Sequence, residues 1–266
     1  MRITLFTCNQ PRHLALIDAL AKVADEVFAI QECNTVFPGK VDDFFRKSPA
    51  MEQYFSRVVA AEKEVFGAPR FPATAVRQLP IKMGDLSRLD LDCLAPALQS
   101  DLYIVFGASF IRGPLCDHLV KRRAVNIHMG VSPYYRGSAT NFWAMYDRRP
   151  DLVGATVHLL SQGLDSGPML FHALPSAQAT DPFVYGLKAV GAAHAALIRH
   201  IERGTLLDLE PIQQDSSKQS RYTRNVDFSD EIANEYLTRL PTAEQLSAAI
   251  QRRDARQFVR PEIVEC

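Results

Sequence analysis

The sequence predicts an α/β protein with a mostly parallel sheet flanked by helices. A strand, a helix and a second strand follow one another at the start, because residues 2–7 and 26–31 are apolar runs and residues 11–25 carry apolar side chains at helical spacing. Residues 102–106 (LYIVF) are apolar without alternation, which is typical of a parallel strand buried on both faces. Strands joined through a helix form a right-handed parallel unit, and ligands favour the carboxyl ends of such strands.

Composition limits the classes of function. The chain has 266 residues, enough for one α/β unit with an extension and a sizeable core. Its 30 basic and 30 acidic residues cancel, which argues against a nucleic-acid partner with its need for a large positive field. No apolar stretch is long enough for a signal peptide or a membrane span, so we expect a cytoplasmic protein without a membrane partner.

The five cysteines are scattered without a C-x-x-C pair. They are therefore expected to be free thiols, and no zinc or other metal site is predicted. Cys8 and Cys116 lie beside apolar runs, where a small buried hydrophobe is favoured over a nucleophile.

The connection at residues 8–13 contains no glycine, which excludes a dinucleotide-binding fingerprint. Two interpretations remain open. The free N–H groups of a helix start, together with Arg12, are suited to an anion. Alternatively, Pro11 simply marks an ordinary helix start at the first helical position.

Residues 41–66 are helical in character and rich in aromatic side chains, with an interruption at Ser48-Pro49. Packing of these aromatic rings onto the sheet is favoured over a wall of a substrate cleft or a partner surface. A strand is expected near residues 75–81 and a helix at 92–99.

The chemistry is expected where the apolar run from Ala124 ends in Asn126 and His128. Residues two apart on a strand point to the same side, so an amide and an imidazole would lie side by side at a strand end. Asp165 lies in a Gly/Pro loop, where the backbone adopts unusual angles close to a ligand. Alone, each residue is more often structural than catalytic.

The rest of the chain continues the alternation and then changes character. Helices are predicted at 114–123, 141–146 and 181–203, and strands at 125–128, 155–161 and 169–174. The only tryptophan, Trp143, is assigned to the core. We predict a catalytic domain over residues 1–204 and a helical C-terminal extension over 205–266, with helices near 230–240 and 242–253.

Five motifs occur in a fixed order: N-I-H at 126–128, S-P-Y-Y-R-G at 132–137, a Trp-containing helix, G-A-T-V-H at 154–158 and L-D-S-G at 164–167. Together they resemble the folate-dependent formyltransferases, over residues 101–169. The resemblance implies a Rossmann-like formyltransferase fold and transfer of a formyl group from 10-formyltetrahydrofolate to an amine. One departure is Gly-Val-Ser-Pro at 130–133, where many members read S-L-L-P.

The family's catalytic Asn, His and Asp fall by motif on Asn126, His128 and Asp165. In these roles Asn126 would donate a hydrogen bond to the oxyanion, and His128 would take a proton from the attacking amine. Asp165 would orient the imidazole and favour its charged form. His158, on a nearby strand, is a weaker candidate.

The resemblance also implies binding residues. The segment after the strand at 102–106 borders the family's pterin pocket, although a simple strand-to-helix turn at Gly107 is the alternative. The residues expected to bind the cofactor are Phe106, Gly107, Ala108, Ser109, Phe110 and Gly163. Arg12, Tyr134 and Arg136 are expected to contact the acceptor; the two arginines would either serve a diphosphate or be ordinary surface charges.

The motifs look most like the sugar-modifying branch, the sugar N-formyltransferases. A nucleotide-linked amino sugar of surface polysaccharide (lipopolysaccharide O-antigen) biosynthesis is the predicted acceptor, GDP-perosamine being one candidate. Alternatives are a methionyl-tRNA formyltransferase, another small-amine formyltransferase, a formylfolate hydrolase, and a binding module without turnover. The intact Asn126, His128 and Asp165 set favours an enzyme, and the neutral charge argues against tRNA. A homodimer is left open.

Overall fold

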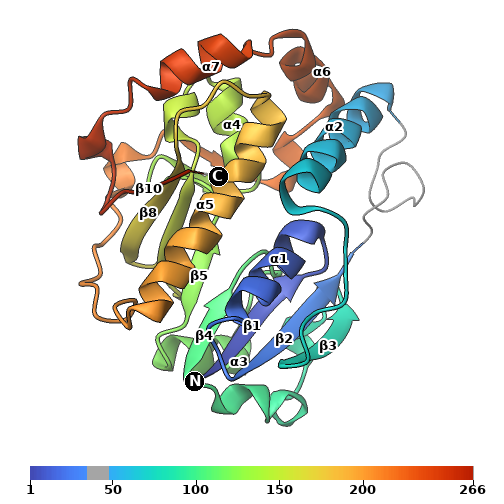
Figure 1. Ribbon diagram of the computed structural model, residues 1–266, viewed down its shortest axis with the longest axis vertical. Helices are drawn as coiled ribbons and strands as arrows, with labels where there is room; N and C mark the ends of the chain where they lie inside the picture. Colours follow the sequence, from blue (N-terminus) through green and yellow to red (C-terminus); the bar gives the residue numbers. More distant parts are fainter. Residues whose placement is uncertain (35–47, 266) are drawn as a thin grey trace.

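A computed structural model describes residues 1–34 and 48–265 and shows a central sheet with helices on both faces (Figure 1). The part of residues 41–66 that precedes Ser48, including Phe44 and Phe45, lies outside the described residues, as does Cys266. The eight strands of the main sheet are ordered β10-β8-β7-β5-β4-β1-β2-β3.

The strands of this sheet are β1 (Arg2–Cys8), β2 (Glu26–Cys33), β3 (Val76–Lys82), β4 (Leu102–Val105), β5 (Val125–His128), β7 (Ala155–Leu159), β8 (Met169–Pro175) and β10 (Glu262–Val264). A separate two-stranded sheet joins β6 (Tyr135–Gly137) and β9 (Arg221–Thr223). The helices are α1 (Pro11–Leu20), α2 (Pro49–Phe66), α3 (Gly113–Lys121), α4 (Thr140–Tyr146), α5 (Pro182–Glu202), α6 (Asp230–Thr238) and α7 (Ala243–Ile250).

The pairing confirms the predicted mostly parallel sheet. β1 lies between β2 and β4, and every neighbouring pair from β5 through β4, β1 and β2 to β3 is parallel. Only β7 runs against its neighbours β5 and β8. The carboxyl ends of β1, β4 and β5 therefore meet at one edge of the sheet, where the predicted chemistry lies.

The sheet separates two apolar layers. Leu5 of β1 faces a core that includes Leu16 of α1 and Leu197 of α5. The next residue, Phe6, faces the opposite core with Leu119 of α3. This alternation is the two-residue period of a strand, and it explains why strands covered by helices on both faces read as unbroken apolar runs.

Two expectations in the first half of the chain have different outcomes. The strand expected near 75–81 is β3, and its Pro80 is tolerated because β3 is an edge strand. The helix expected at 92–99 is wrong, since the chain forms two short 3₁₀ turns, Leu91–Leu94 and Ala97–Gln99. Pro96 stands between them, and a proline cannot donate the hydrogen bond that a continuous helix needs.

The C-terminal segment contains the two predicted helices, α6 and α7, and also adds strand β10 to the edge of the main sheet. Arg253, which follows α7, donates to the carbonyl oxygens of Asp151, Val153 and Pro175 and to the Tyr185 hydroxyl. A half-buried arginine with four acceptors fastens this segment to the sheet. The segment after residue 204 is thus packed against the sheet through Arg253 and β10.

Among the described residues, no helix has both the length and the apolar character needed to cross a membrane.

Candidate active site

A cleft of about 680 Å³ opens at the carboxyl ends of β1, β4 and β5. Its walls come from α1, α2, α4, α5 and α6, and Asn126, His128 and Asp165 all line it. The structure thus brings the three predicted catalytic residues together, at the edge of a parallel sheet where ligands are favoured.

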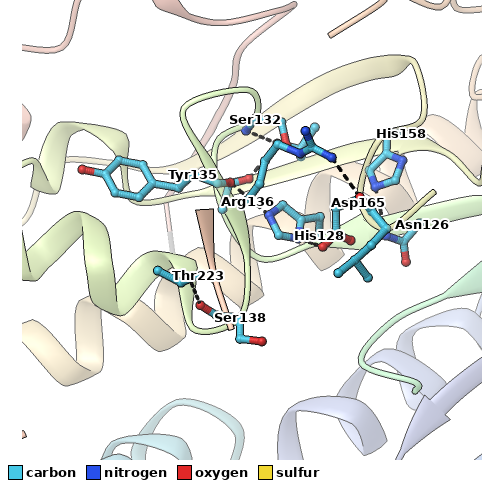
Figure 2. Close-up of polar contacts among 12 residues, drawn as sticks. Asn126, His128, Ser132, Tyr135, Arg136, Ser138, His158, Asp165 and Thr223 are labelled. Carbon is cyan, nitrogen blue, oxygen red and sulfur yellow. Dashed lines mark hydrogen bonds and ion pairs between the residues drawn. The ribbon is translucent and has the colours of Figure 1, made fainter. Parts of the chain in front are cut away.

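His128 and Asp165 form a pair, with 3.4 Å between His128 Nδ1 and Asp165 Oδ2 (Figure 2). His128 is 6% exposed, and its Nε2 lies 3.2 Å from the carbonyl oxygen of Tyr135. Burial alone would lower the pKa of His128, but the Asp165 carboxylate and the Tyr135 carbonyl outweigh it and raise the pKa above its usual value. Burial likewise opposes ionisation of Asp165, yet His128 holds the pKa of that carboxyl below its usual value.

The loop that carries Asp165 is fixed by long-range contacts. Asp165 has a φ of 47°, a left-handed conformation that aspartate tolerates better than most residues. Gln214 Nε2 donates to the carbonyl oxygens of Asp165 and Gly167, each at 2.8 Å. Arg136 donates to the Leu164 carbonyl oxygen at 3.0 Å (Figure 2). These donors hold the carboxylate against His128.

Asn126 is held by His158, its partner in the antiparallel register of β5 and β7. Nδ2 of Asn126 lies 2.9 Å from His158 Nε2, and His158 Nδ1 lies 2.8 Å from the Leu159 carbonyl oxygen (Figure 2). The carbonyl can only accept, so His158 carries its proton on Nδ1 and its Nε2 accepts from Asn126. Burial lowers the pKa of His158 to about 4, which keeps the ring neutral. Asn126 therefore presents its second N–H in a fixed direction.

The turn at residues 130–133 is held in place by Thr156 of β7. The Thr156 hydroxyl donates to the Gly130 carbonyl oxygen at 2.6 Å and accepts from the Ser132 N–H at 2.8 Å. A Cβ on Gly130 would lie 2.5 Å from Thr140 Oγ1 and 3.0 Å from His128 Nε2. The turn thus approaches Thr140 and the His128 ring so closely that a side chain at residue 130 would collide with them.

The predicted cofactor segment divides into two parts. Phe106, Gly107 and Ala108 line the cleft, whereas Ser109 and Phe110 are absent from the described lining. Gly107 has a φ of 70°, and a Cβ there would lie 2.3 Å from a ring carbon of His13. The N–H and hydroxyl of Ser109 both donate to buried Glu32, at 2.5 and 2.8 Å, so Ser109 anchors the segment.

The remaining predicted binding residues lie in different places. Arg12 lines the cleft. Tyr134, Arg136 and Gly163 are not among its described lining residues, although Leu164, next to Gly163, is. Arg136 acts on the Asp165 loop, as described above, rather than on the cavity.

One end of the cleft is aromatic. Tyr54 of α2 packs against Phe142 of α4 and Phe183 of α5, with ring centroids 5.6 and 5.3 Å away, and Tyr236 of α6 completes the wall. Packing onto the sheet is the favoured prediction for this segment; Tyr54 and Phe55 also line the cleft, and α2 packs against α5 and α6.

Sequence reasoning missed Gln214 and Tyr236 and ranked His158 low. Only His158 had a usable signal, because an antiparallel pairing of 125–128 with 155–159 would set it opposite Asn126. Gln214 and Tyr236 reach the site from the C-terminal segment, which carries no local pattern that indicates it.

Thiol and metal chemistry find little support in the described residues. The Cys8 thiol donates to the Glu32 carbonyl oxygen at 2.9 Å, and burial raises the pKa of both Cys8 and Cys116. Within residues 1–34 and 48–265, no group of three or more His, Cys, Asp or Glu side chains is arranged to hold a metal ion.

A family model described as formyl transferase matches residues 56–189. The methionyl-tRNA formyltransferase of Synechococcus sp. (strain JA-3-3Ab) is 29% identical over 147 residues, which are 53% of this chain and 44% of that protein. The methionyl-tRNA formyltransferase of Trichodesmium erythraeum (strain IMS101) is 30% identical over 124 residues, 45% of this chain and 35% of that protein. The chain thus spans less than half the length of these relatives.

Solved structures share the fold at low identity. The formyltransferase PseJ from Anoxybacillus kamchatkensis, in complex with UDP-4,6-dideoxy-4-formamido-L-AltNAc and tetrahydrofolate, matches with a TM-score of 0.51 and 17% identity over 94% of this chain and 100% of that one. A 4-N formyltransferase from Francisella tularensis gives a TM-score of 0.51 and 14% identity over 100% and 98% of the two chains. A sugar N-formyltransferase from Shewanella sp. FDAARGOS_354 gives 0.50 and 18% over 86% and 78%.

Proposed function

Because the chain belongs to the formyl transferase family, we propose that it transfers a formyl group from 10-formyltetrahydrofolate to the amine of a nucleotide-linked amino sugar. The observation that carries this proposal is the meeting of Asn126, His128 and Asp165 on one cleft, with His128 and Asp165 paired at 3.4 Å. A binding module without turnover would need neither a histidine paired with a carboxylate nor an amide fixed in one direction.

Asn126 donates a hydrogen bond to the formyl oxygen. Oxygen gains negative charge when an amine attacks a formyl carbon, and an N–H donor fixed in advance stabilises that charge without reorganisation. His158 already holds one Asn126 N–H, so the second is directed by the sheet rather than by a free rotamer.

His128 acts as the general base that accepts the proton of the attacking amine. Its pKa is raised by Asp165, so its neutral form is a stronger base than an ordinary histidine, and its protonated form is stabilised once the proton has moved. Asp165 acts as the partner that orients the ring and compensates its charge.

The folate donor fits the segment after β4. Phe106, Gly107 and Ala108 line the cleft together with Asn126. The main-chain N–H and carbonyl of Phe106 are bonded to Phe6 and Thr7, so the main-chain groups of Gly107 and Ala108 are the ones that this segment offers to a ligand. These main-chain groups would hold the pterin ring by hydrogen bonds, while 10-formyltetrahydrofolate supplies the formyl group. Glu32, through Ser109, keeps the segment in place.

Two observations favour a sugar nucleotide as the acceptor. The aromatic wall around Tyr54 offers flat apolar surface suited to a base or a deoxysugar. Solved relatives of the same fold include a formyltransferase crystallised with a UDP-linked formamido sugar and tetrahydrofolate. An enzyme with such an acceptor would act in surface polysaccharide biosynthesis, and GDP-perosamine is one candidate acceptor. Methionyl-tRNA is the second candidate, because curated relatives carry that activity.

The test is a formyl-transfer assay with 10-formyltetrahydrofolate and UDP-, dTDP- and GDP-linked 4-amino sugars, with initiator methionyl-tRNA as a parallel arm. Mass spectrometry would detect the formylated acceptor. Transfer to a sugar nucleotide, lost in His128→Asn, supports the proposal. Transfer to methionyl-tRNA alone would show that the acceptor is the tRNA and not a sugar nucleotide. No transfer to any of these acceptors would contradict the proposed formyltransferase activity.

A further inference from the structure

The start of α1 has the geometry of an anion site, but the protein's own carboxylate already fills it. Helix α1 begins at Pro11, on the rim of the cleft, and its first turn points positive partial charge at the space in front of it. Glu62 of α2 lies in that space: its Oε1 accepts from the Arg12 N–H at 3.1 Å and from Arg12 Nη1 at 2.8 Å.

No main-chain donor of the first turn remains for a ligand. Pro11 has no N–H, and the Arg12 N–H is bonded to Glu62. The N–H groups of His13 and Leu14 both donate to the Gln10 carbonyl oxygen, at 2.9 and 3.1 Å. An incoming phosphate would therefore have to displace an internal bond to gain a donor here.

The charge of Arg12 is compensated in the same way. Glu62 is 5% exposed, so its carboxylate is held within the protein rather than in solvent. A buried carboxylate in contact with a guanidinium remains in place because separating the two would leave an unpaired charge. A second anion beside Arg12 would meet the Glu62 carboxylate at close range and be repelled.

The neighbouring polar side chains offer acceptors rather than donors. The Thr7 hydroxyl donates to the Phe106 carbonyl oxygen at 2.8 Å, so it must accept from His13 Nδ1, also at 2.8 Å. Burial and the nearby Arg12 hold the pKa of His13 well below its usual value, so the ring is neutral and Nε2 keeps a lone pair. Gln10 Oε1 is buried without a hydrogen-bond partner.

We infer that Glu62 is a specificity-determining residue: it excludes phosphate from the α1 end of the cleft, so that the formyl acceptor enters there with an uncharged, hydroxyl- or N–H-bearing group. The term acceptor rests on the proposed function; the exclusion of phosphate does not. Arg12, predicted from the sequence to serve a diphosphate, is instead the internal partner of Glu62, and a diphosphate is held elsewhere.

The experiment is a titration of the protein with inorganic phosphate, followed by ³¹P line broadening, without folate or acceptor. Four proteins are compared: the wild type, Glu62→Gln, the double variant Glu62→Gln with Arg12→Gln, and Glu64→Gln. Glu64 is exposed on the same helix, so its variant removes the same charge without opening the site. Glu62→Ala is a second opening variant, and circular dichroism confirms that each protein is folded.

We expect Glu62→Ala, which frees the Arg12 donors, to bind phosphate at least about tenfold more tightly than the wild type and Glu64→Gln, the gain of one charge-assisted hydrogen bond. Glu62→Gln removes the negative charge but keeps an oxygen that can accept from Arg12, so its gain should be smaller. The gain should disappear in the double variant, because it depends on Arg12. Equal phosphate affinity in the folded Glu62 variants and Glu64→Gln would overturn the inference. Wild-type binding at the same affinity as Glu62→Gln would do so too. Neither result bears on formyl transfer, which the assay of the preceding subsection tests separately.

Discussion

Two ion pairs lie along the cleft, and they differ in what they leave exposed to a ligand. Arg12 and Glu62 contact at 2.8 Å and use up the donors at the start of α1. His128 and Asp165 lie farther apart, at 3.4 Å, and include a histidine whose pKa the neighbouring carboxylate raises above its usual value. His128 ends β5, and Arg12 lies in the first turn of α1, which follows β1 of the same sheet.

A charged pair at a cleft is therefore not by itself a sign of catalysis. An arginine stays charged at any working pH, so its pair with a carboxylate shapes and closes a surface. A histidine paired with a carboxylate can move a proton, and its raised pKa serves that task. We therefore expect changes at the His128 end to act mainly on rate and changes around the Arg12 end on selectivity and stability.

The largest effect is expected from breaking the catalytic end. His128→Asn or Asn126→Ala should lower turnover by about a hundredfold or more, because each removes a group needed as charge develops. Steady-state kinetics measure the loss, and an unchanged melting temperature serves as the control. Near wild-type rates in either variant would refute the site assignment.

Asp165→Asn should lower turnover to a similar extent and also change its pH dependence. Asp165 raises the pKa of His128, so the wild-type rate should rise with pH through an apparent pKa above the usual 6.5 of histidine. Without the carboxylate, this limb should move to lower pH. A pH–rate profile that keeps its position in Asp165→Asn would contradict the pairing and point to titration of the acceptor amine.

His158→Leu should cost about tenfold in turnover, because Asn126 would lose the acceptor that fixes its amide. His158→Gln keeps an oxygen that can accept from Asn126 and should restore part of the rate. The KM for the folate donor serves as the comparison and should change little. Equal losses in Leu and Gln would indicate that His158 matters only for packing.

Substitutions near the Arg12 end of the cleft should change the stability of the protein rather than its turnover. Burial lowers the pKa of His194, which packs against Phe106, to about 3. Between pH 6.5 and about 3 the unfolded chain therefore binds a proton that the folded protein does not, and stability falls as pH drops, by up to about 1.4 kcal/mol per pH unit. His194→Phe should flatten this slope in urea unfolding; an unchanged slope would mean that His194 titrates normally.

The smallest effects are expected away from both pairs. Cys116→Ala should leave turnover within about twofold, because burial raises the pKa of that thiol and it lies in the core behind the sheet. A chelator should also leave the rate unchanged. A folded but inactive Cys116→Ala protein, or activity abolished by chelation, would revive a thiol or metal mechanism.

Local sequence patterns were enough to predict the alternation of strands and helices, the placement of Asn126 and His128 on one strand, and the loop that carries Asp165. These features follow from local periodicity and turn chemistry, which act over a few residues. The helix expected at 92–99 shows the limit, since one proline outweighed the apolar pattern there.

The side chains that meet at the site come from segments far apart in the sequence, so their contacts follow from the packing of the fold. Glu62 lies 50 residues from Arg12, and Gln214 lies 49 residues from Asp165. Tyr54 lines the cleft and packs against side chains of α5 and α6. Contacts between distant segments depend on how helices and strands pack in three dimensions, and neighbouring residues in the sequence carry no record of that packing.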